Sequence, residues 1–294
     1  MSAKARVVAI VAVVAALAAG AVVGVTVLQT RGESTGSALR KGAPPLYLVV
    51  AGPLRQALTL YQAGKRTQAG AIFARYHSLP AEIGLAFSSW PHGSLDAVKR
   101  LVAEHPKSGL AELHLGLADY WSGRDDDAVS SWKLAARLEP DSPSAVTALD
   151  LLNPRVIPGL PYIVVDVAHV GGKARLPLER GILAWDRERP VSAKRQLDAA
   201  AALAPNDPAV LTAAAVAAFS PAHPLRPFPM LGPLSGRFPK AAVVRLHLGL
   251  LLLWTKQVAK AEKELRAAIA LQPGSAYARS AEELLNGLAK DGTK

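Results

Sequence analysis

The stretch LHLGLADYWSGRDDDAVSSWKLAARLEPDS (residues 113–142) determines the architecture, because its spacing occurs twice more in the chain. Its pentapeptide LHLGL is repeated at residues 246–250. A glycine is followed at fixed offsets by two alanines and a proline, and segments 180–207 and 246–275 repeat these offsets. The pattern consists of Gly116, Ala128, Ala135 and Pro140; Gly181, Ala193, Ala200 and Pro205; and Gly249, Ala261, Ala268 and Pro273. Three matches of four positions indicate a true internal repeat.

Each copy has the features of a helix, a turn and a second helix. The glycine of the first helix can face the first alanine of the second, which lets the two helix axes approach closely. A bulky residue stands four positions after that alanine, one turn along the same face: Trp132, Leu197 or Leu265. The closing proline lacks an N–H and disfavours helical geometry in the residue before it, so it ends the second helix.

These segments resemble the tetratricopeptide repeat, a helical hairpin with a small-residue, alanine and proline signature, and in particular the membrane-anchored bacterial type. Weaker copies lie at residues 53–80 and 81–106. Asp119 stands where the family has an aromatic residue, and Tyr76 stands where it has alanine. The resemblance implies an all-α, right-handed solenoid of hairpins over residues 49–291.

Two proline-rich inserts interrupt the repeats, at residues 153–172 and 220–240. Both are partly apolar, so we expect ordered extended segments that cross the solenoid, with a short strand at residues 162–168. The final segment, residues 276–290, is expected to be a capping helix, because the last hairpin has no successor to cover it.

The N-terminal region predicts a membrane anchor. Residues 7–28 are apolar apart from Thr26, and a helix of this length spans about 33 Å, enough to cross a bilayer core. We therefore divide the chain into a tail and transmembrane signal anchor (1–30), a linker (31–48) and the repeat domain (49–291). The anchor predicts a single-pass plasma-membrane protein with an extracytoplasmic C-terminal domain; a cleaved signal peptide is the alternative. The small residues Ala16, Gly20 and Gly24 could pair two such helices in a homodimer.

Composition excludes several classes of function. The chain has no cysteine, so disulfides and thiolate metal sites are excluded. Its net charge of +11 is spread out rather than gathered in a basic run, which disfavours nucleic-acid binding. No nucleophile motif, phosphate loop or metal-binding spacing is present, so we predict no catalytic residue, no metal and no cofactor. Asp166 and His169 are the one pair that an enzyme could use, and such a site would need a polar pocket.

First helices line the concave surface in the family that the repeats resemble. Their predicted groove residues here are apolar and aromatic, and they form a hypothetical partner-binding groove: Leu113, Leu117, Tyr120, Trp121, Ile182, Trp185, Leu250, Leu253 and Trp254. The groove either accepts a partner segment or is covered by the inserts. We predict a non-enzymatic scaffold or adaptor for protein partners; the alternative is an envelope-biogenesis or secretion factor that holds a client polypeptide transiently.

Overall fold

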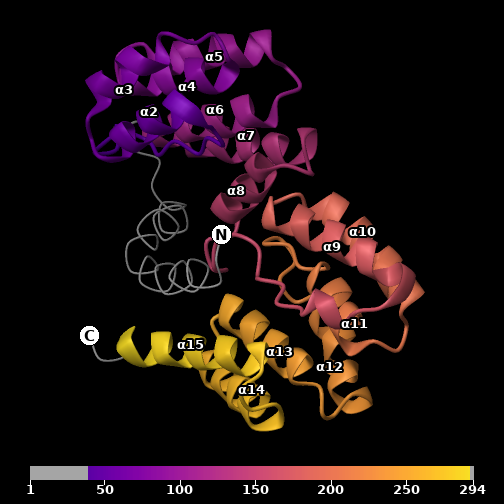
Figure 1. Cartoon of the computed structure of the whole chain (residues 1–294). Coiled ribbons are helices and arrows are strands. Elements are labelled where there is room, and N and C mark those ends of the chain that lie inside the picture. Colours follow the sequence, from indigo (N-terminus) through magenta and orange to yellow (C-terminus); the bar gives the residue numbers. More distant parts are fainter. Residues whose placement is uncertain (1–38, 292–294) are drawn as a thin grey trace. The chain divides into compact units, whose positions relative to one another are not determined.

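The computed structural model describes residues 39–291, which divide into two compact units (Figure 1). We call residues 39–152 the N-terminal unit and residues 153–291 the C-terminal unit. All regular secondary structure in the described residues is helical, which confirms the all-α prediction and leaves no strand at residues 162–168.

The N-terminal unit contains three helical hairpins and a single closing helix. Its helices are α2 (Gly52–Gln62), α3 (Arg66–Phe73), α4 (Leu79–Ser88), α5 (Ser94–Glu104), α6 (Gly109–Trp121), α7 (Asp125–Leu138) and α8 (Pro143–Leu152). Each helix packs on the next one along the chain. The turns use residues suited to them: Gly64 and Gly123 adopt positive φ between paired helices, and the Ser108 side chain caps α6 by accepting from the Ala111 N–H.

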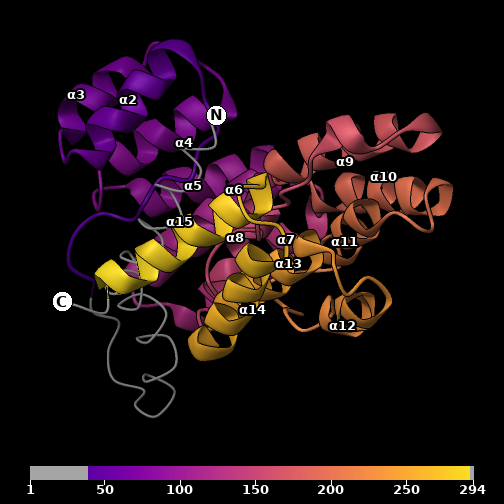
Figure 2. The same ribbon diagram turned by 60° about the horizontal axis from the view of Figure 1, so that its bottom comes forward.

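The C-terminal unit has the same succession of elements. After two short 3-10 turns, η2 (Val167–His169) and η3 (Gly172–Ala174), come α9 (Arg175–Asp186), α10 (Pro190–Leu203), α11 (Pro208–Val216), α12 (Phe228–Arg237), α13 (Ala242–Trp254), α14 (Val258–Leu271) and α15 (Ala276–Asp291). Helices α9 and α10 pair, as do α13 and α14 (Figure 2). Helix α15 packs on α13 and α14.

The repeated glycines lie where the two helices of a hairpin touch. A Cβ on Gly116 would overlap the Trp132 ring, and one on Gly249 would come within 2.8 Å of the Leu265 side chain. Gly181 faces Leu197 in the same way. The alanines of the pattern (Ala128, Ala135, Ala193, Ala200, Ala261 and Ala268) are fully buried, and the prolines (Pro140, Pro205 and Pro273) are exposed in the turn after the second helix.

The two units are counterparts of each other, element by element from α2 and α9 to α8 and α15. The entry to the third hairpin shows the relationship in sequence: HPKSGLAELHLGL (105–117) aligns without a gap with FPKAAVVRLHLGL (238–250), and seven of the thirteen residues are identical. The chain therefore contains a tandem duplication of a three-hairpin unit, a level of repetition above the single hairpin.

The structure corrects the expectation for one proline-rich insert. Residues 153–172 contain turns and the 3-10 turn η2 and no strand, whereas residues 220–240, which we expected to be extended, contain α12, the second helix of a hairpin. Pro229 is tolerated because it lies in the first turn of α12, where a helix needs no N–H donor. Pro233 lies inside the helix, so α12 forms without one of its internal hydrogen bonds.

The predicted anchor (7–28) and its small face (Ala16, Gly20 and Gly24) lie outside the described residues. Within residues 39–291, no helix combines the length and the apolar character that a membrane crossing requires. This finding corrects the predicted single-pass plasma-membrane location.

Candidate functional site

In each unit an irregular segment is hydrogen-bonded to the first helices of the first and third hairpins. We call residues 40–49 the first strap and residues 157–166 the second strap. The first strap begins in the predicted linker, yet its Leu46 and Leu48 side chains are buried, with 4% and 8% of their surface exposed. Tyr47 and Val49 alternate with them and face outward. This period of two is that of an extended chain with one face against a surface.

The backbone of the first strap is held by three hydrogen bonds, two to α6 and one to α2. Arg40 donates its backbone N–H to the Trp121 carbonyl over 2.9 Å. The Tyr61 hydroxyl donates to the Pro44 carbonyl over 2.6 Å. The backbone N–H of Tyr47 points at Nε2 of His114, 3.3 Å away. The strap therefore joins the first hairpin of its unit to the third.

The second strap is held by the corresponding bonds. Ile157 donates its N–H to the Trp254 carbonyl over 3.2 Å, the Trp185 indole donates to the Pro161 carbonyl over 2.7 Å, and Val164 donates its N–H to His247 Nε2 over 3.0 Å. The bonded strap residues follow one another at the same spacing in both units, and the Pro161 carbonyl takes the place of the Pro44 carbonyl. The duplication thus includes the strap and its attachment points.

Each LHLGL histidine is a buried acceptor for its strap. Nδ1 of His114 lies 2.8 Å from the Leu110 carbonyl, and Nδ1 of His247 lies 2.7 Å from the Val243 carbonyl. A carbonyl can only accept, so Nδ1 carries the hydrogen and Nε2 is free to accept from the strap. Both side chains are fully buried. Burial lowers the pKa of each imidazole to about 4, against the opposing effect of the backbone bond, so both are neutral at pH 7.

The residues of the hypothetical groove lie under these straps or in the core. All are buried except Ile182, which is half-buried: Leu113, Leu117, Tyr120, Trp121, Trp185, Leu250, Leu253 and Trp254. In the C-terminal unit, Trp254 also donates its indole N–H to the Gly159 carbonyl over 3.3 Å, and its ring meets Tyr162 edge-on. The three tryptophans of the hypothetical groove, Trp121, Trp185 and Trp254, therefore contact the chain's own straps.

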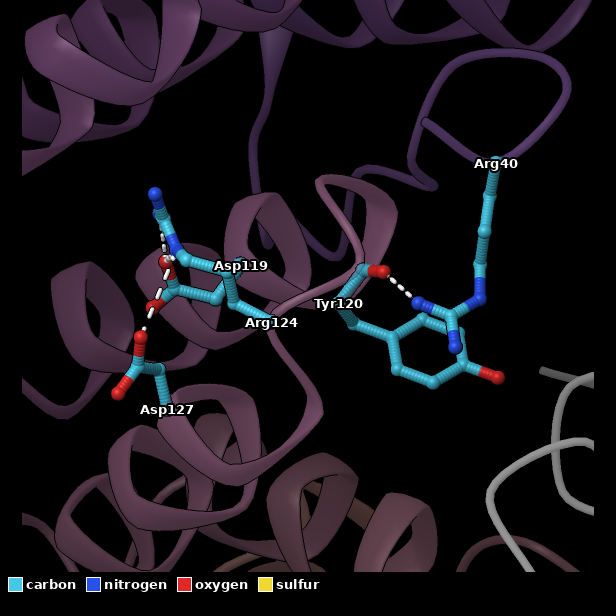
Figure 3. A network of polar contacts seen from close by, with 5 residues as sticks. All are labelled: Arg40, Asp119, Tyr120, Arg124 and Asp127. Atoms are coloured by element: carbon cyan, nitrogen blue, oxygen red, sulfur yellow. Dashed lines mark hydrogen bonds and ion pairs between the residues drawn. The ribbon is translucent and has the colours of Figure 1, made fainter. Parts of the chain in front are cut away.

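Arg40 gives the first strap an anchor that the second lacks. Its guanidinium lies 3.6 Å from the centre of the Tyr120 ring and donates to the Tyr120 carbonyl (Figure 3). It also pairs with Asp125 over 2.8 Å. Stacking on an aromatic face combined with a carboxylate partner is typical of a well-anchored arginine. Ile157 occupies the corresponding place in the second strap.

A shallow cavity of about 520 Å³ lies beside α6, between α5 and α7. It is lined by Lys99, Leu115, Asp119, Arg124, Asp127, Ser130 and Ser131. Asp119 is buried and pairs with Arg124, which also reaches Asp127 over 3.5 Å (Figure 3). Burial raises the pKa of Asp119, and the Arg124 guanidinium opposes this effect. Because both carboxylates of the cavity, Asp119 and Asp127, are paired with Arg124, the cavity does not define the chemistry of a ligand.

Oδ2 of Asp166 lies 2.8 Å from Nδ1 of His169, but 84% of the His169 side chain is exposed. The 520 Å³ cavity in the described part of the chain is lined by residues of α5, α6 and α7 and the turn between α6 and α7, and it does not include this pair. In the same residues, no cluster of three or more histidine and acidic side chains is arranged to hold a metal ion.

No protein-family model and no characterised protein matches the sequence. Three solved structures show low similarity. The TPR2AB domain of yeast Sti1, in complex with pHSP90, shares 12% identity over 81% of this chain and 97% of that chain, with a TM-score of 0.34. Yeast Tom70 shares 11% sequence identity over 82% of this chain and 53% of that chain, with a TM-score of 0.33. The APC/C hetero-tetramer Cut9–Hcn1 shares 16% sequence identity over 80% of this chain and 42% of that chain, with a TM-score of 0.30.

Similarity at this level assigns no residue of this chain to a partner. The tetratricopeptide-like character rests on the chain's own hairpins, with their buried alanines and close glycine contacts.

Proposed function

We propose that the chain is a non-enzymatic scaffold for protein partners, built from two repeat units that each close their groove with their own strap. The observation that carries this proposal is the double set of strap contacts, centred on the Tyr47–His114 and Val164–His247 bonds. A groove that is filled from within gives each unit a fixed shape, so partners meet a preorganised surface and lose less conformational entropy on binding.

The same contacts support a proposal that partners bind the outer faces of the hairpins. A segment that entered a groove would have to displace a strap, exposing buried side chains such as Leu46 or Ile163. Each of these apolar side chains contributes about 1.5–3 kcal/mol when buried. Displacement of a strap is therefore strongly opposed, and the outer surface is open without it.

The straps also support the alternative of a transient client holder. Each groove already holds an extended segment through its backbone groups, which is how such a factor would hold an unfolded chain. In that case the strap would stand in for the client and leave when a client arrives.

Two measurements separate these functions. Affinity purification of the whole chain from its source cells, followed by native mass spectrometry, should yield a protein partner in a fixed ratio. The second measurement uses a double variant, His114→Ala with His247→Ala, which loosens both straps, and a labelled unfolded probe, reduced carboxymethylated α-lactalbumin. If the chain is a scaffold, this variant should capture a negligible amount of the probe. Strong capture of this probe by the double variant would favour the client holder, and recovery of the chain alone would contradict the scaffold.

A further inference from the structure

Helix α12 differs in surface chemistry from α5, its counterpart in the other unit. Each is the second helix of the second hairpin, and each buries one fully enclosed side chain at the matching position, Val98 in α5 and Leu231 in α12. The exposed side of α5 carries both signs of charge: Asp96, Lys99, Arg100 and Glu104. The exposed side of α12 carries prolines, Met230 and Arg237, and Arg237 stands where α5 has Glu104.

The departure from α5 extends to the residues around α12. Between Asp207 and Glu262 the chain has no acidic residue. Within this stretch, the turn before α12 exposes Leu225 and Arg226, and the turn after it exposes Lys240. Helix α12 lies at the edge of its unit in both views (Figures 1 and 2). We call Leu225, Arg226, Met230, Arg237 and Lys240 the α12 face.

The cations of the α12 face are not neutralised within the unit. Arg237 donates to the Pro205 carbonyl over 3.0 Å and to the Asn206 side chain, both uncharged acceptors, which hold the guanidinium in place but leave its charge. Neither Arg226 nor Lys240 forms an ion pair with any described residue. By contrast, Arg245 on the neighbouring α13 pairs with Glu264 over 3.0 Å.

The apolar members of the face point to a protein partner. Leu225 is 60% exposed and Met230 is 44% exposed, and exposed methionine and arginine are enriched at protein interfaces. Three cations are fewer than the clusters of four to eight that bind anionic lipid. No acidic side chain of the face opposes an incoming carboxylate.

Building on the scaffold function proposed above, we propose that the α12 face docks an acidic segment of a partner protein. Leu225 and Met230 are its apolar anchors, and Arg226, Arg237 and Lys240 meet the carboxylates. Charged contacts at such a rim set specificity and the rate of association, and they weaken as salt rises.

A fluorescein-labelled peptide of alternating pairs of glutamate and leucine, EELLEELLEELL, tests the inference by fluorescence anisotropy with the whole chain. The charge-reversal variant is R226E/K240E. The matched control is R100E/K107E, because Lys107 is the counterpart of Lys240 after α5. We expect Kd to rise at least fivefold in the first variant and less than twofold in the control. Binding by the unmodified chain should weaken between 50 and 300 mM NaCl.

Several results would overturn the inference: no binding of the peptide, equal weakening in both variants, or preferential binding to vesicles of phosphatidylcholine and phosphatidylglycerol at 3:1. Met230→Asp, which removes an anchor from an exposed position without emptying the core, should also weaken peptide binding. A native partner that co-purifies equally with R226E/K240E would reject the α12 face and keep the scaffold. Absence of any partner for the unmodified chain would reject the scaffold itself.

Discussion

Val164 donates its backbone N–H to Nε2 of His247 over 3.0 Å, and Tyr47 makes the corresponding bond to His114 in the other unit. Two histidines that are far apart in the sequence thus each use a buried imidazole to accept a hydrogen bond from a strap N–H. Every residue except proline has a backbone N–H, so the side chains of the strap can differ between the units. The contact requires only that the strap is extended and that its N–H lies within hydrogen-bonding distance of the imidazole. The histidine is the part of the contact that both units share.

Removing the acceptor should destabilise the unit that contains it. His114→Ala leaves a cavity and deprives the Tyr47 N–H of its partner, and we expect a loss of about 2–4 kcal/mol in the free energy of unfolding. Urea denaturation measures this loss. The control, His77→Ala, removes an exposed histidine and should change stability by no more than about 0.5 kcal/mol. Equal effects of the two substitutions would show that the His114 contact contributes nothing.

Stability should fall as the pH drops below 6.5. The folded pKa of His114 and His247 is about 4, below the ordinary value of 6.5, so between these values the unfolded chain binds protons that the folded chain does not. No contribution arises above pH 6.5, and the penalty reaches its full size near pH 4. Each histidine should lower the free energy of unfolding by about 2 kcal/mol between pH 7 and pH 5.

Urea denaturation at pH 7, 6 and 5 measures the pH dependence. The double variant H114Q/H247Q has no titrating group at these positions and should show a distinctly shallower fall. Identical slopes for the variant and the unmodified chain would mean that the two imidazoles are not buried and neutral in the folded state.

The hairpin glycines should not tolerate a methyl group. Gly116→Ala would drive a Cβ into the Trp132 ring and to 3.0 Å from the Ala128 carbonyl, so we expect a loss of about 1–3 kcal/mol. In α12, a Cβ on Gly236 meets no atom within 4 Å. Gly236→Ala should therefore stabilise the chain by about 0.5–1 kcal/mol through helix propensity. Thermal unfolding compares the two, and a stabilising Gly116→Ala would refute the close helix contact.

The orientation of the first strap can be tested with single thiols, because the chain has no cysteine of its own. Leu46 is 4% exposed and Val49 is 80% exposed. Leu46→Cys should react with Ellman's reagent at least about tenfold more slowly than Val49→Cys, since reaction requires access to the thiolate. Equal rates in the native protein, with both becoming fast in urea, would indicate that the strap does not lie on the unit.

Much of the fold could be predicted from the sequence, because hairpin packing depends on local spacing. The contact of Gly116 with Ala128 and Trp132 can be predicted from their spacing, because all three lie within seventeen residues. The prolines mark where second helices end. The tandem duplication was harder to recognise. The clearest evidence for it in the sequence is the alignment of residues 105–117 with residues 238–250. The LHLGL pentapeptide alone does not reveal this alignment, which also depends on the matching proline and lysine that precede it.

The site was predicted less well than the fold, for a physical reason. Strap contacts join residues such as Tyr47 and His114 through a backbone donor, and a backbone donor leaves no signature in the sequence. The available signal was the equivalent placement of His114 and His247 in an apolar helix, which indicates a shared structural role but does not identify the partner. For α12, the prolines suggested an extended segment, whereas the position of Pro229 in the first turn and the packing of Leu231 allow a helix despite Pro233 in its interior.

Amide hydrogen exchange at Tyr47 and Val164 tests most directly whether each unit is closed by its own strap. Both N–H groups donate to a buried imidazole, whereas no hydrogen bond to another described residue is found for the Val49 N–H. We predict slow exchange at Tyr47 and Val164 and fast exchange at Val49. In His114→Ala, protection should disappear at Tyr47 and persist at Val164. Fast exchange at both positions in the unmodified chain would contradict the account.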